Sequence, residues 1–218
     1  MSIINSEQGL TVFGYGVCAA AALLLFFIGG VMSQNNRHTL STRQLVFCGT
    51  AMALSFVTSY IKLVHMPYGG SVTLFSMLFI CLTGYWYGVR VGILTGLAYG
   101  ILQFLQEPYV LSFFQVCCDY VLAFAGLGLA GVFAKSKHGL LKGYLLGILV
   151  RGLFHSIGGY LYWMDYMPEN FPQTLTAVYP IIYNYSYILA EGVLTVIVLM
   201  LPPVQKGLEQ IRKMAQQA

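Results

Sequence analysis

Four residues at regular spacing give one apolar stretch of the chain a chemistry that lipid contact would not select. Arg151, His155, Gly159 and Trp163 follow one another at intervals of four. In a helix, residues at this spacing fall on one slowly drifting stripe. The stripe carries a cation, an imidazole, a gap and a large aromatic ring, so it suits the binding of a polar small molecule.

The composition predicts that this stripe belongs to an all-α membrane protein. Hydrophobic residues make up 58% of the 218 residues and charged residues only 8%, whereas a soluble domain carries about 25% charge. We expect a polytopic helical bundle in the lipid bilayer, with no role in nucleic-acid binding despite a net charge of +4. The cysteines lack CxxC spacing, and no nucleotide-binding loop is present. We therefore expect no metal site, no disulfide, no cofactor and no coupling to ATP by this chain alone.

Apolar runs predict seven membrane helices and a polar tail. The first covers about 9–32, and we expect it to be retained because no basic residue precedes its apolar core. The other six are expected at about 44–64, 72–88, 91–106, 110–133, 143–163 and 178–201. The chain then divides into three parts, which are an extra N-terminal helix with a cytoplasmic loop (1–43), a six-helix binding domain (44–203) and a cytoplasmic tail (204–218).

The distribution of charge predicts the topology. Basic residues gather in the 33–43 loop, at Arg90, in the 134–142 loop and in the tail, whereas the opposite side has Lys62 alone. Basic residues favour the cytoplasmic side of a membrane. We therefore expect the N-terminus outside and the C-terminus in the cytoplasm.

Ionisable groups within membrane helices are costly, and they usually face an interior cavity. A rise of ~1.5 Å per residue puts Asp119, His155 and Asn184 at similar heights, ~20 to ~27 Å from the cytoplasmic ends of their helices. We expect an outward-open cavity at this height, although a purely structural histidine and an interfacial tryptophan remain alternatives. The expected lining is Asp119, Tyr120, His155, Trp163, Tyr179 and Asn184.

Two further charges lie deeper in the bundle. Arg151 is one turn below His155, and Glu191 is two turns below Asn184. We expect them to form a structural ion pair that closes the cavity floor, because an unpaired charge there would be expensive. Tyr109, Tyr160 and Tyr162 are interpreted as belt or packing residues.

One carboxylate among aromatic rings suits a flat heteroaromatic cation, because aromatic faces attract cations and stack on rings. Two other classes of function stay open. One is an intramembrane enzyme that uses Asp119 or Glu191 with His155, and the other is a receptor or structural membrane protein. No protease or transferase spacing is present, so we expect that the protein is not an enzyme.

The segment from about 44 to 203 resembles the thiamine-specific substrate-binding subunit (S-component) of energy-coupling factor (ECF) transporters. The shared motifs are Tyr68-Gly-Gly-Ser-Val-Thr-Leu-Phe-Ser-Met77, Gly96-Leu-Ala-Tyr-Gly-Ile-Leu-Gln103, Gln115-Val-Cys-Cys-Asp119-Tyr-Val-Leu-Ala-Phe-Ala-Gly-Leu-Gly-Leu-Ala-Gly131, His155-x7-Trp163, and Tyr179-x4-Asn184 with Glu191.

The resemblance implies a six-helix fold that binds thiamine near the outer surface. Two aromatic positions of the family differ here, because Tyr99 and Gly70 stand where some members have tryptophan. Tyr68 or Tyr99 is expected to supply the missing aromatic surface. The residues that the resemblance assigns to the ligand are Asp119, Tyr120, His155, Gly159, Trp163, Tyr179 and Asn184.

The resemblance also implies partners, namely a membrane T-component and two cytoplasmic ATPases. Small residues on the first helix of the family contact the T-component, and Gly49, Ala51 and Ala53 occupy that region here. The helix at 9–32 departs from the six-helix pattern.

Overall fold

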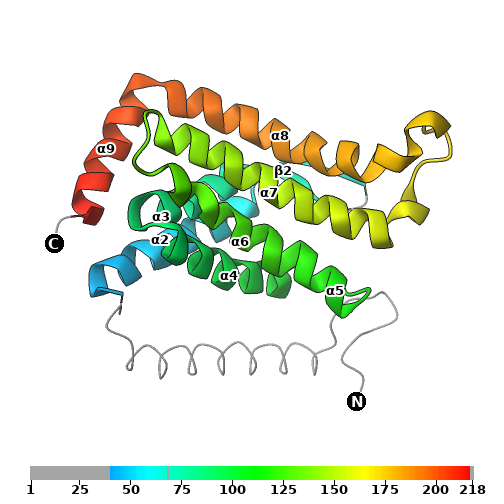
Figure 1. Cartoon of the computed structure of the whole chain (residues 1–218), viewed down its shortest axis with the longest axis horizontal. Coiled ribbons are helices and arrows are strands. Elements are labelled where there is room, and N and C mark those ends of the chain that lie inside the picture. The colour runs from blue at the N-terminus through cyan, green and yellow to red at the C-terminus, as the bar shows by residue number, and fades with distance from the viewer. Residues whose placement is uncertain (1–39, 68, 217–218) are drawn as a thin grey trace, which may run out of the picture.

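The structure is a computed structural model that describes residues 40–67 and 69–216 (Figure 1). It is a helical bundle, as predicted, and the predicted helix at 9–32 lies outside the described residues. α7 and α8 run side by side along the molecule, with α9 at one end and the α7–α8 loop at the other. The main helices are α2 (Thr42–Ser59), α3 (Ser76–Tyr87), α4 (Val89–Gln106), α7 (Gly139–Tyr162), α8 (Tyr179–Met200) and α9 (Pro202–Gln216).

One further long helix spans Phe113–Phe133 and changes its winding along its length. We call it the α5–α6 helix. It contains a π-helical segment near its start and a 3-10 segment at its end. Its parts are α5 (Phe113–Val116), the π-helical segment (Cys117–Leu122), α6 (Ala123–Leu127) and the 3-10 segment (Gly128–Phe133).

Within the described residues, four helical stretches are long and apolar enough to cross a membrane. They are Val89–Gln106, Phe113–Phe133, Gly139–Tyr162 and Gln173–Met200. Large apolar side chains stay exposed on the outside of the bundle, as for Leu149 and Ile197. Such a surface is suited to lipid, so the chain is a multi-pass membrane protein.

The predicted helix at 44–64 is wrong at its C-terminal end. α2 ends at Ser59, where the Ser59 hydroxyl donates to the carbonyl of Phe56. Such a bond competes with the helix backbone. The chain then forms an antiparallel hairpin of β1 (Lys62–His65) and β2 (Ser71–Thr73). Gly69 and Gly70 close the hairpin with φ values of +90° and +80°, which glycine adopts at little cost.

Glycines allow α4 to approach the α5–α6 helix closely. Gly96 and Gly100 lie one turn apart, and a Cβ at either would collide with a backbone carbonyl of the neighbouring helix. The carbonyls concerned are those of Phe124 and Tyr120. Small residues are the usual basis of close helix packing in lipid. This contact holds the start of the α5–α6 helix, where Asp119 lies, firmly against α4.

The polar tail forms helix α9, which packs across the ends of α2 and α3. Arg212 donates from Nη1 to the Tyr85 hydroxyl at 2.9 Å, and its Cζ lies 4.9 Å from the Tyr85 ring centroid. Gln216 donates to the Trp86 carbonyl at 2.8 Å. The α3–α4 turn and α9 therefore share one end of the bundle.

Candidate ligand-binding site

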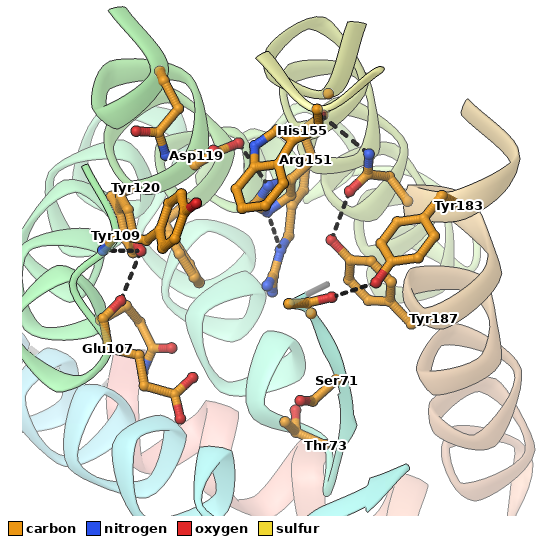
Figure 2. Close-up of a pocket in the computed structure, with 18 of the residues that line it drawn as sticks. Ser71, Thr73, Glu107, Tyr109, Asp119, Tyr120, Arg151, His155, Tyr183 and Tyr187 are labelled. Carbon is orange, nitrogen blue, oxygen red and sulfur yellow. Dashed lines mark hydrogen bonds and ion pairs between the residues drawn. The ribbon is translucent and has the colours of Figure 1, made fainter. Parts of the chain in front are cut away.

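A cavity of about 560 Å³ opens at the end of the bundle opposite α9. This volume is within the usual range for small-molecule sites. Its walls come from α4, the α5–α6 helix, α7, α8 and the hairpin, as Figure 2 shows. The lining brings together seven of the residues predicted for the ligand, which are Asp119, Tyr120, His155, Gly159, Trp163, Tyr179 and Asn184.

Asp119 lies in the π-helical segment Cys117–Leu122 and is held by two protein donors. Its Oδ2 accepts from Gln115 Nε2 at 2.8 Å, and its Oδ1 is 3.1 Å from His155 Nδ1. Gln115 is fully buried, and its own oxygen accepts from the Leu111 amide. π-Helical turns occur often at functional sites. The carboxylate is therefore fixed in direction before any ligand arrives.

The hydrogen bonds of His155 settle which ring nitrogen carries its proton. Arg151 donates from Nε to His155 Nε2 at 3.3 Å, so this nitrogen acts as an acceptor. Nδ1 then carries the hydrogen and donates to Asp119. Arg151, His155 and Asp119 form one chain of hydrogen bonds along the cavity wall (Figure 2).

Asn184 connects α8 to α7 at the same height. Its Nδ2 donates to the carbonyls of His155 and Pro180, at 3.2 and 2.8 Å. Its Oδ1 accepts from the Tyr187 hydroxyl at 2.9 Å. Gly159 faces this amide, since a Cβ there would lie 3.1 Å from Nδ2. The glycine thus leaves room for the asparagine in the wall.

One aromatic wall surrounds Trp163. The ring centroids of Tyr109 and Tyr166 lie 4.7 and 5.0 Å from that of Trp163, and their hydroxyls are 3.3 Å apart. Burial, and then the hydrogen bond to Tyr166, raise the pKa of Tyr109 to about 12, so its phenol is neutral at physiological pH. The interpretation of Tyr109 as a belt or packing residue is wrong, because it lines the cavity.

A second aromatic wall follows α8, of which the sequence predicted Tyr179 but not Tyr183 and Tyr187. Tyr179, Tyr183 and Tyr187 follow one another along one helix face, with successive ring centroids 5.8 and 6.2 Å apart and interplanar angles of 45° and 74°. Their spacing of four residues, continued by Glu191, is the signal that could have identified them.

The hairpin closes against this second wall. Tyr183 donates from its hydroxyl to the Gly69 carbonyl at 2.9 Å. A Cβ on Gly70 would lie 2.6 Å from the Tyr187 ring. Position 70 therefore has no room for a side chain, and Tyr187 supplies the aromatic surface beside it. Tyr68, which was expected to help here, lies outside the described residues.

Tyr120 lines the cavity, but its hydroxyl is occupied by the chain itself. It donates to the Glu107 carbonyl at 2.7 Å and accepts from the Tyr109 amide at 3.2 Å. Tyr120 thereby holds the loop after α4 in place. Lys62 of the hairpin forms an ion pair with the Glu107 side chain at the same edge of the cavity.

The prediction that Tyr99 faces the ligand is wrong. Its side chain is 1% exposed, it is not part of the cavity lining, and its hydroxyl donates to the Ser55 carbonyl at 3.1 Å. Its ring packs edge-on against Phe124, with centroids 5.2 Å apart. The α4 side chains that do line the cavity are Gln103 and Gln106, whereas the Tyr99 ring packs into the core.

The predicted ion pair between Arg151 and Glu191 is not formed in the described structure, where Lys62 pairs with Glu107 and Asp119 accepts a hydrogen bond from the neutral His155. Glu191 is buried and accepts from the amides of Thr73 and Met77, at 2.9 and 3.2 Å. The Thr73 hydroxyl also donates to it at 2.6 Å. The start of α3 thus satisfies this carboxylate, and Arg151 lines the cavity instead.

The three small residues predicted for partner docking point in different directions on α2. Ala51 is buried at 6% exposure, so its side chain packs into the bundle and offers no docking surface. Ala53 is exposed, and Gly49 is half-buried with open space beside its Cα. In the described ranges, no cluster of three or more His, Cys, Asp or Glu residues could hold a metal ion.

Comparison with known proteins places this architecture among transporters. The family model described as "Thiamine transporter protein" matches residues 45–210. The thiamine transporter ThiT of Bacillus subtilis (strain 168) is 28% identical over 189 residues, which cover 78% of this chain and 93% of that protein.

Two solved structures are also similar. ThiT from Listeria monocytogenes aligns with a TM-score of 0.57 and 23% identity, over 73% of this chain and 94% of its own. An S component of a bacterial ECF transporter aligns with a TM-score of 0.43 and 21% identity, over 70% and 92% of the two chains. The likeness in fold rests on the first of these two.

Proposed function

Because the chain belongs to the thiamine transporter protein family, we propose that it is the subunit that captures thiamine for an ATP-driven ECF uptake transporter. The observation that carries this proposal is the position of Asp119, a fixed carboxylate in a cavity between two aromatic walls. The family and the curated relative are named as transporters, so the reading as an intramembrane enzyme is set aside.

The cavity has the chemistry that a cationic two-ring ligand requires. Trp163 and Tyr109 offer one aromatic surface, and Tyr179 and Tyr183 offer another. Aromatic faces stack on flat rings and attract cations. Asp119 adds a negative charge that favours hydrogen-bond donors and cationic groups. Thiamine combines a cationic ring with a neutral ring that carries an amino group, and both features find a partner here.

The sequence of the proposed binding domain, residues 44–203, has no GxxxxGK[ST] phosphate-binding loop, so we infer that the energy comes from partners. We infer a membrane T-component and two cytoplasmic ATPases. The exposed part of α2 around Gly49 and Ala53 is the proposed contact surface, because small residues allow close approach of a second helix in lipid. Ala51 is not part of it.

We further propose that the cavity faces outward and the C-terminus lies in the cytoplasm. Lys135 and Arg212 line one groove together with Gly88 of the α3–α4 turn, at the end of the bundle away from the cavity. Basic residues favour the cytoplasmic side. The cavity edge carries Glu107 and the acidic α7–α8 loop, which suits the outer side.

A titration of the purified full chain with thiamine tests the proposal. We expect tight binding that quenches Trp163 fluorescence. Asp119→Asn should weaken affinity by roughly 30-fold or more, because truncating one partner of a buried charged contact costs about 2–5 kcal/mol. Glu209→Gln, which alters an exposed carboxylate on α9, is the matched control and should bind normally.

Two results would contradict the proposal. One is the absence of heat and of quenching with thiamine. The other is full affinity in Asp119→Asn, which would remove the carboxylate from the site. Titrations with the pyrimidine precursor and with a second heteroaromatic cation establish whether another vitamin is the preferred ligand.

A further inference from the structure

A second hollow lies at the end of the bundle that carries α9, away from the ligand cavity (Figure 1). It has a volume of about 440 Å³, and we call it the α9 groove. Its walls come from the end of α3, the α3–α4 turn, the end of the α5–α6 helix with the loop after it, and α9. Two cations, Lys135 and Arg212, line it, and none of the described residues in its lining is acidic. The proposed capture of thiamine gives this groove no role.

Arg212 is fixed in the α9 groove by contacts that leave its charge uncompensated. Its Nη1 donates to the Tyr85 hydroxyl at 2.9 Å, and its Nε donates to the Gln216 side chain at 3.2 Å. In residues 40–67 and 69–216, neither Arg212 nor Lys135 forms an ion pair. Two cations in one hollow repel each other, and a shared anion stabilises both. The groove therefore suits a negatively charged ligand.

The α9 groove lies at the level where the chain enters the membrane. Gly88 in its lining directly precedes the candidate span Val89–Gln106, and Ala134 directly follows the candidate span Phe113–Phe133. Val132 also lines the groove and is 56% exposed, so apolar surface begins beside the two cations. A ligand that joins an anionic group to an apolar chain matches both features.

We propose that the α9 groove binds the phosphate of an anionic phospholipid headgroup, with Lys135 and Arg212 as donors and an acyl chain beside Val132. Basic pockets between membrane helices are a known form of headgroup site, and a guanidinium matches the geometry of phosphate. A bound headgroup would connect α9 to the loop after the α5–α6 helix and hold this end of the bundle at the membrane surface. The site is separate from the thiamine cavity and does not depend on the proposed function.

The test measures lipid binding by the purified full chain. Delipidated protein in a neutral detergent is titrated with dioleoylphosphatidylglycerol or with dioleoylphosphatidylcholine, and native mass spectrometry counts the lipids bound. We expect one phosphatidylglycerol per chain. Phosphatidylcholine should bind at least about tenfold more weakly, because its headgroup adds a cation that faces two others.

Variants of the two cations test whether the lipid occupies the groove. Lys135→Gln and Arg212→Gln should each weaken phosphatidylglycerol binding about fivefold, the effect expected of one basic residue near an anionic lipid. Lys135 is exposed, so Lys135→Gln tests the site even if Arg212→Gln loosens α9. Lys137→Gln and Lys213→Gln change exposed lysines outside the groove and are the matched controls. Thermal unfolding shows that each variant is folded.

Four results would overturn the inference. Equal binding of the two lipids would remove the requirement for an anionic headgroup. An equal loss in Lys135→Gln and Lys137→Gln would mean that lipid is attracted to the whole basic surface and not to a site. Displacement of the lipid by millimolar inorganic phosphate would assign the groove to free phosphate. Tighter binding of a glutamate-rich peptide than of the lipid would assign it to an acidic protein segment.

Discussion

At the scale of single residues, the direction of the Asp119 carboxylate depends on neighbours that do not need to touch a ligand. Gln115 fixes one oxygen and His155 the other. A preorganised group binds more tightly because less freedom is lost on binding. The residues behind the acid should therefore affect affinity nearly as much as the acid itself.

Gln115→Leu should weaken thiamine binding by roughly tenfold, because a hydrogen bond to a charged group contributes about 1.5–3 kcal/mol and Asp119 would lose its fixed direction. Calorimetric titration measures the change. Gln210→Leu, at an exposed position of α9, serves as the control. Unchanged affinity in Gln115→Leu would show that His155 alone orients the acid.

Gly158→Ala should also reduce affinity, by about tenfold or more. A Cβ at position 158 would lie 2.9 Å from Asp119 Oδ1, so the carboxylate must move. A misplaced contact group costs binding energy even when its charge is kept. Gly207→Ala adds the same methyl group where no atom lies within 4 Å, and its binding curve should overlay that of wild type. Equal affinities for the two variants would contradict this account.

The sequence predicted the height of the site residues better than their direction. The rise per residue of a helix is constant, so Asp119, His155 and Asn184 were correctly brought to one level. The direction of a side chain around the helix axis depends on tertiary packing, which the neighbouring residues in the sequence do not determine. Tyr99 therefore turned out to be buried behind the cavity. Arg151 and Glu191 were placed near the floor but have different partners.

At the scale of elements, Glu191 acts as a cap for α3 although it belongs to α8. α3 begins without a side-chain cap of its own, and Phe75 before it has a φ of +62°. The Glu191 carboxylate accepts from the amides of Thr73 and Met77 at that helix start. Free amides and the helix dipole both favour a negative charge there.

Glu191→Gln should destabilise the protein by about 2–4 kcal/mol, because the amide would face backbone donors with a donor of its own. Thermal unfolding in detergent should show a melting temperature lower by several degrees. Glu209→Gln on α9 is the control and should melt like wild type. A melting temperature equal to wild type in Glu191→Gln would mean that water satisfies the start of α3.

The hairpin of β1 and β2 is the element that the sequence analysis did not predict. Residues 60–65 still contain the apolar Ile61, Leu63 and Val64, so hydropathy alone continues the helix past its true end at Ser59. The signal for the change was in the glycines at 69 and 70, which support a tight reversal. The π-helical segment around Asp119, which packs against α4, was not predicted either.

At the scale of the whole molecule, the two ends of the bundle differ in chemistry. One end carries the aromatic cavity and an acidic loop, and the other carries α9 with the basic groups near it. A membrane protein with such a difference has one favoured orientation. The proposed route of thiamine, from the outside into the cavity, depends on that orientation.

Thiol labelling of intact cells tests the orientation. A membrane-impermeant reagent should label Glu169→Cys in the α7–α8 loop and should not label Lys137→Cys in the α6–α7 loop, both of which are exposed positions. The parent protein measures the background, since its described cysteines are buried or half-buried. The reverse pattern would place the cavity on the cytoplasmic side.

The π-helical segment also constrains where related chains can gain or lose a residue. A π-helical turn holds one residue more than the α-helical turn that it replaces. A homologue that lost that residue would rotate its acid by about 100° away from the cavity, unless the acid moved one place along the chain. Gain or loss of a single residue within a membrane helix, and not in a loop, is thus a route by which lineages of this fold could exchange one ligand for another.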